Sequence, residues 1–335
     1  MISIWWFAFG YFACYVPYSA LTKGLSDGAI AGLPRVAGLA ILPVSNLASM
    51  IGMIAFISAM GWWKHAGRAR VGCVSFPWPN RYTFVSGLAT ATVIATTTLA
   101  YTFHGVSIVL MMLLLRGGVL VLAPLVDLLS RRLVRWYSWV ALGLSLLALL
   151  VTFVAHAGFA ITAWAALDVV CYVGAYFIRL RFMSRLAKAE DENASKRYFV
   201  EEQMIASPAL VLALTLAALF APASLAAPLR HGFSLLTAGG ATAVTLLVIG
   251  VLSQGTGIFG GLVLLDKREN SFCVPVNRAS SLLAGTGAAF VVAALWHGKL
   301  PTWDELTGAA LLVTAILVLS VPGVLAKRRA ASRAA

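Results

Sequence analysis

Ten stretches of this chain are long and almost entirely apolar, and short polar segments separate them. They lie near residues 3–21, 37–62, 82–103, 106–128, 136–155, 159–179, 199–220, 234–257, 272–295 and 305–325. A helix that crosses a bilayer needs about 20 mostly apolar residues, so each stretch predicts one membrane-spanning helix. The eighth is the least regular, because Gly239 and Gly240 interrupt it and it can be extended to Leu265. The pattern predicts an all-α membrane protein with ten transmembrane helices.

The composition supports this prediction and excludes several classes of protein. Of the 335 residues, 61% are apolar and only 11% are charged, whereas about 25% of the residues in a soluble domain are charged. So few charges cannot cover a soluble globule, and lipid is expected to surround most of the protein. A soluble enzyme, a disordered chain and a disulfide scaffold are therefore excluded.

The basic residues carry a topology signal. If the N-terminus is cytoplasmic, the C-terminal tail and the connectors that follow even-numbered spans are cytoplasmic too. These segments hold 19 of the 25 Lys and Arg residues, counting Arg179 after the sixth span, and the opposite side holds four. Because basic residues accumulate in cytoplasmic loops, both termini are predicted to be cytoplasmic. The net charge of +13 is then a topology signal, and no nucleic-acid partner is expected.

An internal repeat is visible in the second part of each half. Residues 130–153 align without a gap on residues 297–320, with a shared Leu-x-x-Trp at the start of both segments. Both segments lead into the last span of a five-helix half. Because five is odd, the second half is expected to be inverted relative to the first, with a substrate site near the midplane. The predicted divisions are a first repeat (1–155), span six with a cytoplasmic connector (156–198), the remainder of the second repeat (199–325) and a basic cytoplasmic tail (326–335).

The segment Trp-His-Gly-Lys-Leu-Pro-Thr-Trp at 296–303, followed by Gly308, resembles the motif that precedes spans five and ten in the drug/metabolite transporter superfamily. Members of that superfamily have ten spans in two five-helix repeats with short basic ends. In topology the resemblance covers essentially the whole chain, and it is closest to the EamA-like ten-helix transporters. It implies that the chain transports a small molecule.

Two local patterns resemble the nucleotide-sugar and triose-phosphate transporter branch. Val-Pro-Val-Asn-Arg at 274–278 is similar to an Asn-Lys element in span nine, with Arg in place of Lys, and Phe-Val-Glu-Glu-Gln at 199–203 is similar to an aromatic–amide segment in span seven. A cation in span four is a further feature of the branch, and Arg116 lies in span four. The resemblance implies substrate contacts at Arg116, Glu202, Gln203, Asn277 and Arg278.

Two arginines lie inside predicted spans, where a charged side chain costs at least ~2.5–3.5 kcal/mol. Arg116 is near the middle of its span. It either binds an anionic group such as phosphate through its planar guanidinium, or it forms a structural ion pair with Asp168 or another acid. Arg278 lies near the start of span nine, where it either joins Asn277 in the same site or snorkels to the cytoplasmic headgroups. Two arginines from opposite halves would clamp an anion.

Span six carries a polar stripe of Asp168, Tyr172, Tyr176 and Arg179. These residues recur at helical spacing, so the stripe is expected to face protein or a cavity rather than lipid. Tyr172 is a candidate substrate contact. Asp168 either exchanges a proton in a coupled transport cycle or neutralises an arginine.

Further candidates come from spans seven, one and three. At the start of span seven, Glu201 is expected to be solvated, whereas Glu202 or Gln203 is expected to reach the site. Tyr15 and Tyr101 lie on faces that also carry tyrosine and threonine. Such groups suit sugar or base rings, although close helix packing explains the threonines equally well.

No catalytic or metal site is expected. The four cysteines have no paired or metal-ligand spacing, and the five histidines are scattered among connectors. The chain contains no phosphate-binding loop for ATP. We therefore expect no enzymatic activity, no cofactor and no metal ion.

These observations predict a secondary transporter that moves a small organic anion by alternating access, with a sugar phosphate or nucleotide conjugate preferred. One alternative is an exporter of amino acids or other metabolites, in which Arg116 binds a carboxylate. A second is a membrane-embedded accessory or lipid-handling protein. The Ala- and Arg-rich composition favours the inner membrane of a bacterium. The expected partners are a small anionic metabolite and membrane lipids, and no oligomeric state is predicted.

Overall fold

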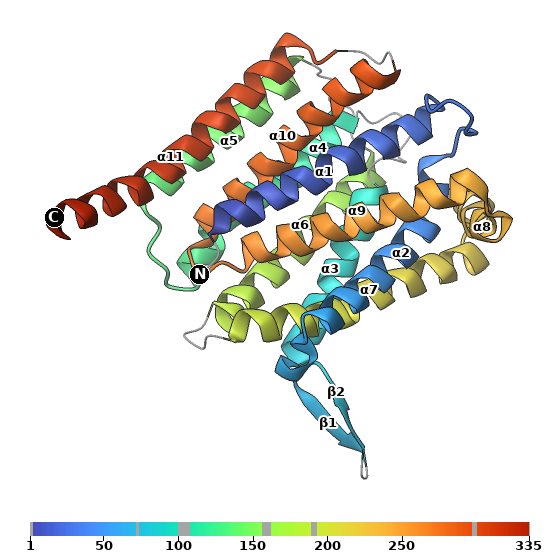
Figure 1. The fold of residues 1–335 in the computed structure, drawn as a ribbon, viewed down its shortest axis with the longest axis horizontal. Helices are drawn as coiled ribbons and strands as arrows, with labels where there is room; N and C mark the ends of the chain where they lie inside the picture. The colour runs from blue at the N-terminus through green and yellow to red at the C-terminus, as the bar shows by residue number, and fades with distance from the viewer. Residues whose placement is uncertain are drawn as a thin grey trace.

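The computed structural model describes residues 3–71, 74–99, 108–155, 162–188, 193–296 and 300–334, which form a bundle of α-helices with one projecting β-hairpin (Figure 1). The helices are α1 (Ile4–Asp27), α2 (Gly38–Ala59), α3 (Arg81–Leu99), α4 (Ile108–Leu129), α5 (Trp136–Ala155), α6 (Ala163–Phe182), α7 (Ala194–Phe220), α8 (Ala223–Ala238), α9 (Gly240–Leu264), α10 (Asn270–Trp296) and α11 (Trp303–Ala334). Strands β1 (Arg68–Val71) and β2 (Val74–Pro77) form the hairpin, and two short helical turns are η1 (Trp62–His65) and η2 (Met183–Ala187).

The helices coincide with the apolar stretches of the sequence, and α8 is additional. Within the described residues, five helices are long and apolar enough to cross a membrane, namely α2, α6 continued by η2, α7, α9 and α10. Trp136–Val151 and Leu306–Ser320 are shorter apolar helical segments. The predicted all-α class is confirmed, and the chain is compatible with a multi-pass integral membrane protein.

Helix α8 occupies a segment that we expected to be mostly a connector. As a result, α9 begins at Gly240 rather than near residue 234, and it continues to Leu264. Gly239 and Gly240 have φ values of 67° and 77°, a backbone region that glycine enters without a steric penalty. The turn at these glycines separates α8 from α9 and sets the start of α9.

The β-hairpin is the second element that the hydrophobic pattern did not predict. Its strands are antiparallel, with Arg68 opposite Pro77 and Arg70 opposite Ser75. Figure 1 shows that the hairpin extends away from the helices. Two strands of four residues are too short to produce a recognisable alternation within a basic connector.

Helix packing follows the same pattern in both halves. Helix α1 packs against α9 and α10, and α6 packs against α3 and α4. Helix α2 packs against α9 as α7 packs against α3. Three further pairs join α2 to α7, α4 to α10 and α5 to α11, and the last pair lies along one edge of the bundle (Figure 1).

Glycines allow two of these corresponding helix pairs to approach closely. A Cβ atom at Gly250 of α9 would lie 2.6 Å from the Cβ of Ala48 in α2. A Cβ atom at Gly87 of α3 would lie 2.6 Å from the Cβ of Ile205 in α7. Small residues permit close contact between membrane helices, so the α2–α9 and α3–α7 contacts each depend on a position without a side chain.

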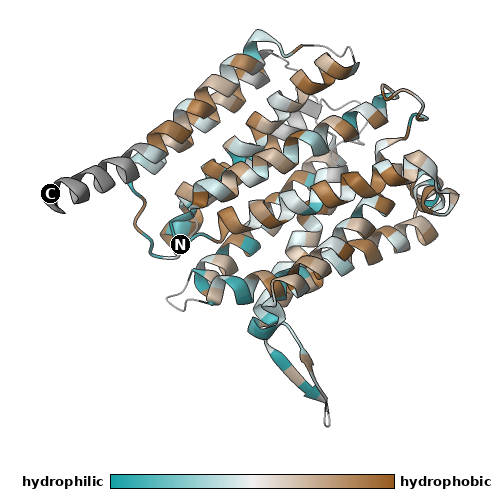
Figure 2. Cartoon of the chain, in the orientation of Figure 1, coloured by the Kyte–Doolittle hydropathy of each residue, from teal (hydrophilic) through white to brown (hydrophobic). Residues whose placement is uncertain are grey.

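The connectors that we predicted to be cytoplasmic meet at one end of the bundle. Arg132, between α4 and α5, donates hydrogen bonds to the carbonyl oxygens of Lys188 after η2 and Lys267 after α9. The backbone N–H of Gly67, before the hairpin, donates to Glu201 of α7. Figure 2 shows hydrophilic residues gathered at this end, whereas hydrophobic residues follow the helices. The basic connectors of the sequence thus form one basic end of the folded protein. The side of the membrane that this end faces stays a prediction.

Candidate functional site

The central polar cluster is built around Arg278 of α10, whose side chain is buried. The guanidinium carbon lies 4.9 Å from the ring centroid of Tyr176, so the cation stacks on the aromatic face. Two guanidinium nitrogens, Nε and Nη2, have no hydrogen-bond partner among the described residues. Burying a charge without hydrogen-bond partners costs free energy. An anion that accepted hydrogen bonds from these two nitrogens would offset that cost.

Helix α6 supplies the aromatic wall of this central cluster. Tyr172 and Tyr176 are one helical turn apart, both are buried, and their ring centroids are 4.9 Å apart. Asp168, one turn earlier, is also buried, and its Oδ2 atom has no hydrogen-bond partner in the described part of the chain. The polar stripe of span six therefore faces the protein interior, as predicted.

Helix α1 lines the cluster with a row of tyrosines. The ring centroids of Tyr11 and Tyr15 are 5.5 Å apart, and those of Tyr15 and Tyr18 are 5.6 Å apart, all in edge-to-face geometry. The side-chain amide of Asn277 donates a 3.1 Å hydrogen bond to the carbonyl oxygen of Gly260 in α9. A Cβ atom at Gly260 would lie 3.1 Å from the Tyr11 ring. The backbone of α9 thus holds Asn277 and Tyr11 together next to Arg278.

Arg116 of α4 belongs to the same cluster. The Arg116 side chain is half-buried. Helix α4 also packs against both α6 and α10. The two arginines of predicted spans, which come from opposite halves of the sequence, therefore lie on adjacent helices.

The structural alternative for Arg116 was an ion pair with Asp168 or another acid, and the described residues form no such pair. The ion pairs within the described residues are Lys23–Asp27, Arg179–Glu202, Arg197–Glu201 and Arg268–Asp266. Arg116 and Asp168 take part in none of them. The central cluster therefore holds two cations that no direct ion pair within the described part of the chain neutralises.

A second polar cluster lies beside the first, around the fully buried Glu202 of α7. Arg179 of α6 donates two hydrogen bonds to the Glu202 carboxylate, each 2.9 Å long. Ser86 and Thr90 of α3 donate to the same carboxylate at 2.8 and 3.1 Å. A bidentate arginine–carboxylate pair is strong and directional, so this cluster joins α3, α6 and α7.

These contacts correct one of our expectations and give a second residue a partner. Arg179 does not belong to the cytoplasmic basic residues, because it is buried in α6 and bound to Glu202. Its removal from the count leaves the charge asymmetry large. The carboxylate of Glu202 binds Arg179, and the substrate contact that we expected of Glu202 stays a prediction. Gln203 is buried next to it, and Tyr101 lies outside the described residues.

The comparisons with known proteins give information about the fold alone. No family model matches the chain, and no curated protein matches it. A solved structure described only as the crystal structure of a protein has a similar fold, with a TM-score of 0.57 and 12% sequence identity over 96% of each chain. At this identity the similarity concerns the fold alone, so membership of the drug/metabolite transporter superfamily stays a prediction.

Glu201, which we expected to be solvated, is buried. Its carboxylate accepts hydrogen bonds from the backbone N–H groups of Gly67 and Asn80 at 2.9 and 3.0 Å. Thr83 and Arg197 donate to it at 2.6 and 2.8 Å. Glu201 therefore fixes the two ends of the hairpin segment to α7. The sequence pattern missed this role because the N–H donors come from a distant connector.

Asp127, near the end of α4, holds the helix of Arg278 in place, a structural role that sequence reasoning missed. It is fully buried, and its two carboxylate oxygens accept from the backbone N–H groups of Asn270 and Ser271 at 2.9 and 2.7 Å. The side chains of the same two residues donate to it at 2.8 and 2.7 Å. Asp127 therefore caps the N-terminus of α10, the helix that carries Arg278. The feature of the sequence that could have identified Asp127 is a single acidic residue inside an apolar stretch.

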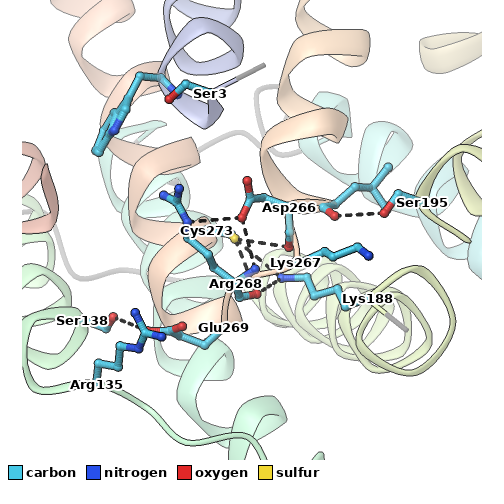
Figure 3. A network of polar contacts seen from close by, with 12 residues as sticks. Ser3, Arg135, Ser138, Lys188, Ser195, Asp266, Lys267, Arg268, Glu269 and Cys273 are labelled. Atoms are coloured by element: carbon cyan, nitrogen blue, oxygen red, sulfur yellow. Dashed lines mark hydrogen bonds and ion pairs between the residues drawn. The ribbon is translucent and has the colours of Figure 1, made fainter. Parts of the chain in front are cut away.

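The loop between α9 and α10 is held by polar contacts to its neighbours (Figure 3). The Nζ atom of Lys188 donates to the carbonyl oxygen of Arg268 at 2.7 Å, and Ser138 donates to Glu269 at 3.0 Å. Arg135 donates to the Tyr137 hydroxyl at 2.6 Å, and this hydrogen bond raises the pKa of the Arg135 guanidinium. The start of α10 is thus anchored at the basic end of the bundle. Within the described residues, no group of three His, Cys, Asp or Glu side chains is arranged to hold a metal ion.

Proposed function

We propose that this chain is a secondary transporter for a small organic anion, and that the central cluster of Arg116, Asn277, Arg278 and the tyrosines of α1 and α6 binds it. The observation that carries this proposal is the buried guanidinium of Arg278, which has two nitrogens without a hydrogen-bond partner in the described part of the chain. A planar guanidinium binds phosphate or carboxylate through two parallel hydrogen bonds. Arg116, on the adjacent helix α4, adds a second positive charge.

The packing pattern supports an alternating-access mechanism. The partners of α1 and α2 correspond to the partners of α6 and α7, five spans later along the chain. This correspondence is expected of two five-helix repeats, which are inverted relative to each other because each has an odd number of spans. In our proposal the repeats rock about the central cluster. Because Arg278, Tyr11, Tyr172 and Tyr176 are buried, an anion reaches them only when the helices around them separate.

The substrate that we propose is a phosphorylated sugar or a nucleotide conjugate. Aromatic rings line the cluster on two sides and suit a sugar or base ring. Two cations suit a phosphate with more than one negative charge. Either counter-exchange with a second anion or a proton on Asp168 compensates the transported charge. We place the protein in a bacterial inner membrane on composition alone.

The proposal is tested in liposomes that contain the purified protein and are preloaded with a sugar phosphate or a nucleotide conjugate. We expect wild-type protein to exchange external labelled phosphate ester. Arg278→Gln and Arg116→Gln should each reduce exchange at least about tenfold, since a hydrogen bond to a charged group contributes about 1.5–3 kcal/mol. Arg35→Gln, which removes an exposed arginine at the other end of the bundle, is the matched control and should exchange at the wild-type rate.

The same assay distinguishes the proposed phosphate-ester transporter from an exporter of amino acids. The distinction is needed because a guanidinium also binds a carboxylate. Liposomes preloaded with amino acids in place of phosphate esters would then show exchange that depends on Arg116. Absence of exchange with every phosphate ester, together with full transport activity in Arg116→Gln and Arg278→Gln, would overturn the anion-binding proposal.

A further inference from the structure

A pocket of about 560 Å³ lies at the basic end of the bundle, between the end of α4 and the end of α6 with η2. Its lining residues are Leu129, Ser130, Arg131, Arg132, Arg181, Ser184 and Arg185. The lining thus contains four arginines, two hydroxyl groups and no carboxylate. Pockets for small organic ligands have volumes of about 300–1,000 Å³, so this one is large enough for a phosphate-bearing headgroup or a small phosphate ester.

Hydrogen bonds hold four of the lining side chains in place. Arg132 donates hydrogen bonds to the carbonyl oxygens of Lys188 and Lys267 at 3.0 and 3.2 Å. Arg181 donates to the Ser130 hydroxyl at 2.8 Å, and Ser184 accepts from the side-chain amide of Asn270 at 2.6 Å. Neutral oxygens therefore fix two of the arginines without cancelling their charge.

Among the described residues, the carboxylates near this pocket have partners of their own. Asp127 is buried and accepts four hydrogen bonds from Asn270 and Ser271. Asp266 forms an ion pair with Arg268, and Glu269 accepts from Ser138 (Figure 3). Within the described part of the chain, no ion pair neutralises the arginines of the pocket.

The backbone at Arg131 is a second, independent observation. Its φ is 53°, and it is the non-glycine residue with positive φ in the described part of the chain. It ends α4, with its N–H bonded to the carbonyl oxygen of Leu128 and the N–H of Arg132 bonded to that of Asp127. Glycine is the usual residue at this position of a helix end. The chain therefore carries a charged side chain at the rim of the pocket although the backbone favours glycine there.

An apolar track leads along α4 to the pocket. Val121, Leu125, Leu128 and Leu129 are all exposed and recur at helical spacing on one face of α4. A phospholipid whose headgroup lies in the pocket would place its acyl chains along this face.

We infer that the arginine pocket binds a phosphate-bearing anion, separately from the central cluster, and that an anionic phospholipid headgroup is the favoured source. Arginine forks bind phosphate oxygens through paired hydrogen bonds. A soluble phosphate compound offers the same chemistry, so the test includes both sources. The inference does not rest on the proposed transport activity, because its readout is binding.

The test measures the thermal unfolding midpoint of the full-length protein in neutral detergent, titrated with phosphatidylglycerol, phosphatidylcholine or inorganic pyrophosphate. A ligand that binds the folded state raises the midpoint in a concentration-dependent way. We expect phosphatidylglycerol to raise the midpoint of wild-type protein and phosphatidylcholine to leave it unchanged. Arg131→Gly should need about tenfold more phosphatidylglycerol for the same shift. Its midpoint without ligand should not fall, because glycine adopts positive φ freely.

Arg185→Gln, which changes an exposed residue of the pocket, should weaken binding similarly, whereas Arg70→Gln on the hairpin should bind as wild type does. A response to phosphatidylglycerol alone identifies the lipid, and an equal response to pyrophosphate identifies a soluble phosphate compound; both outcomes support the pocket. The inference is overturned if wild-type protein responds to neither probe. It is also overturned if Arg131→Gly and Arg185→Gln respond as wild type does, or if Arg70→Gln loses as much response as they do.

Discussion

Two buried arginines, Arg179 and Arg278, have opposite surroundings. Arg179 donates two hydrogen bonds to the carboxylate of Glu202. Arg278 stacks on the Tyr176 ring, and its Nε and Nη2 find no acceptor among the described residues. The first arginine is neutralised inside the protein, so it stabilises the fold. The second retains hydrogen-bonding capacity for a ligand.

The role of Glu202 gives a prediction about stability. Glu202→Gln leaves the Arg179 charge buried without a carboxylate, which should lower the free energy of unfolding by about 3–5 kcal/mol. The measurement is denaturant or thermal unfolding of the purified protein in detergent. Asp27→Asn is the control, because it breaks an exposed ion pair with Lys23 that should contribute only about 0–1 kcal/mol. Equal losses in the two variants would show that the Arg179–Glu202 pair does not stabilise the fold.

At the scale of elements, α9 contains glycines with contrasting surroundings. A Cβ at Gly250 would clash with Ala48 of α2, whereas a Cβ at Gly257 would meet no atom within 4 Å. Gly250→Ala should therefore destabilise the protein by about 1–3 kcal/mol through overpacking. Gly257→Ala should be neutral or stabilising, since alanine favours a helix by about 0.8–1 kcal/mol over glycine. Thermal unfolding of both variants checks this pair, and a Gly250→Ala variant as stable as Gly257→Ala would contradict the close α2–α9 contact.

The hairpin and α10 show how contacts between elements fix positions that a local pattern leaves open. Glu201 of α7 holds Gly67 and Asn80 on either side of the hairpin. Asp127 of α4 caps the first residues of α10. In both places a carboxylate accepts from backbone N–H groups that would otherwise lack a partner at a helix or strand end. The N–H donors and the acid are far apart in sequence, so periodicity alone does not reveal them.

At the scale of the whole molecule, the connectors rich in Lys and Arg lie together at one end, with Arg132 bound to two of the others. Figure 1 shows both chain ends on this side of the bundle. An even number of membrane crossings would produce this arrangement. The positive-inside rule then predicts that this end faces the cytoplasm.

Cysteine labelling tests the orientation. In a chain whose four native cysteines are replaced by serine, Arg35→Cys and Arg70→Cys place one exposed thiol at each end of the bundle. A membrane-impermeant maleimide should label Arg35→Cys in intact cells and Arg70→Cys in inverted vesicles. The opposite pattern would mean that the basic end faces outward.

The sequence by itself determined where the long helices lie and that the protein is suited to lipid. In a bilayer the backbone must satisfy its own hydrogen bonds. An apolar stretch of about 20 residues does so by forming a helix. It also identified Arg116 and Arg278 as the cations that topology does not explain. Only the tertiary structure decided which charges are neutralised. Glu202 binds Arg179, while Arg278 faces a tyrosine ring. Helix packing determines these partners, because it brings residues that are far apart in sequence within hydrogen-bonding distance.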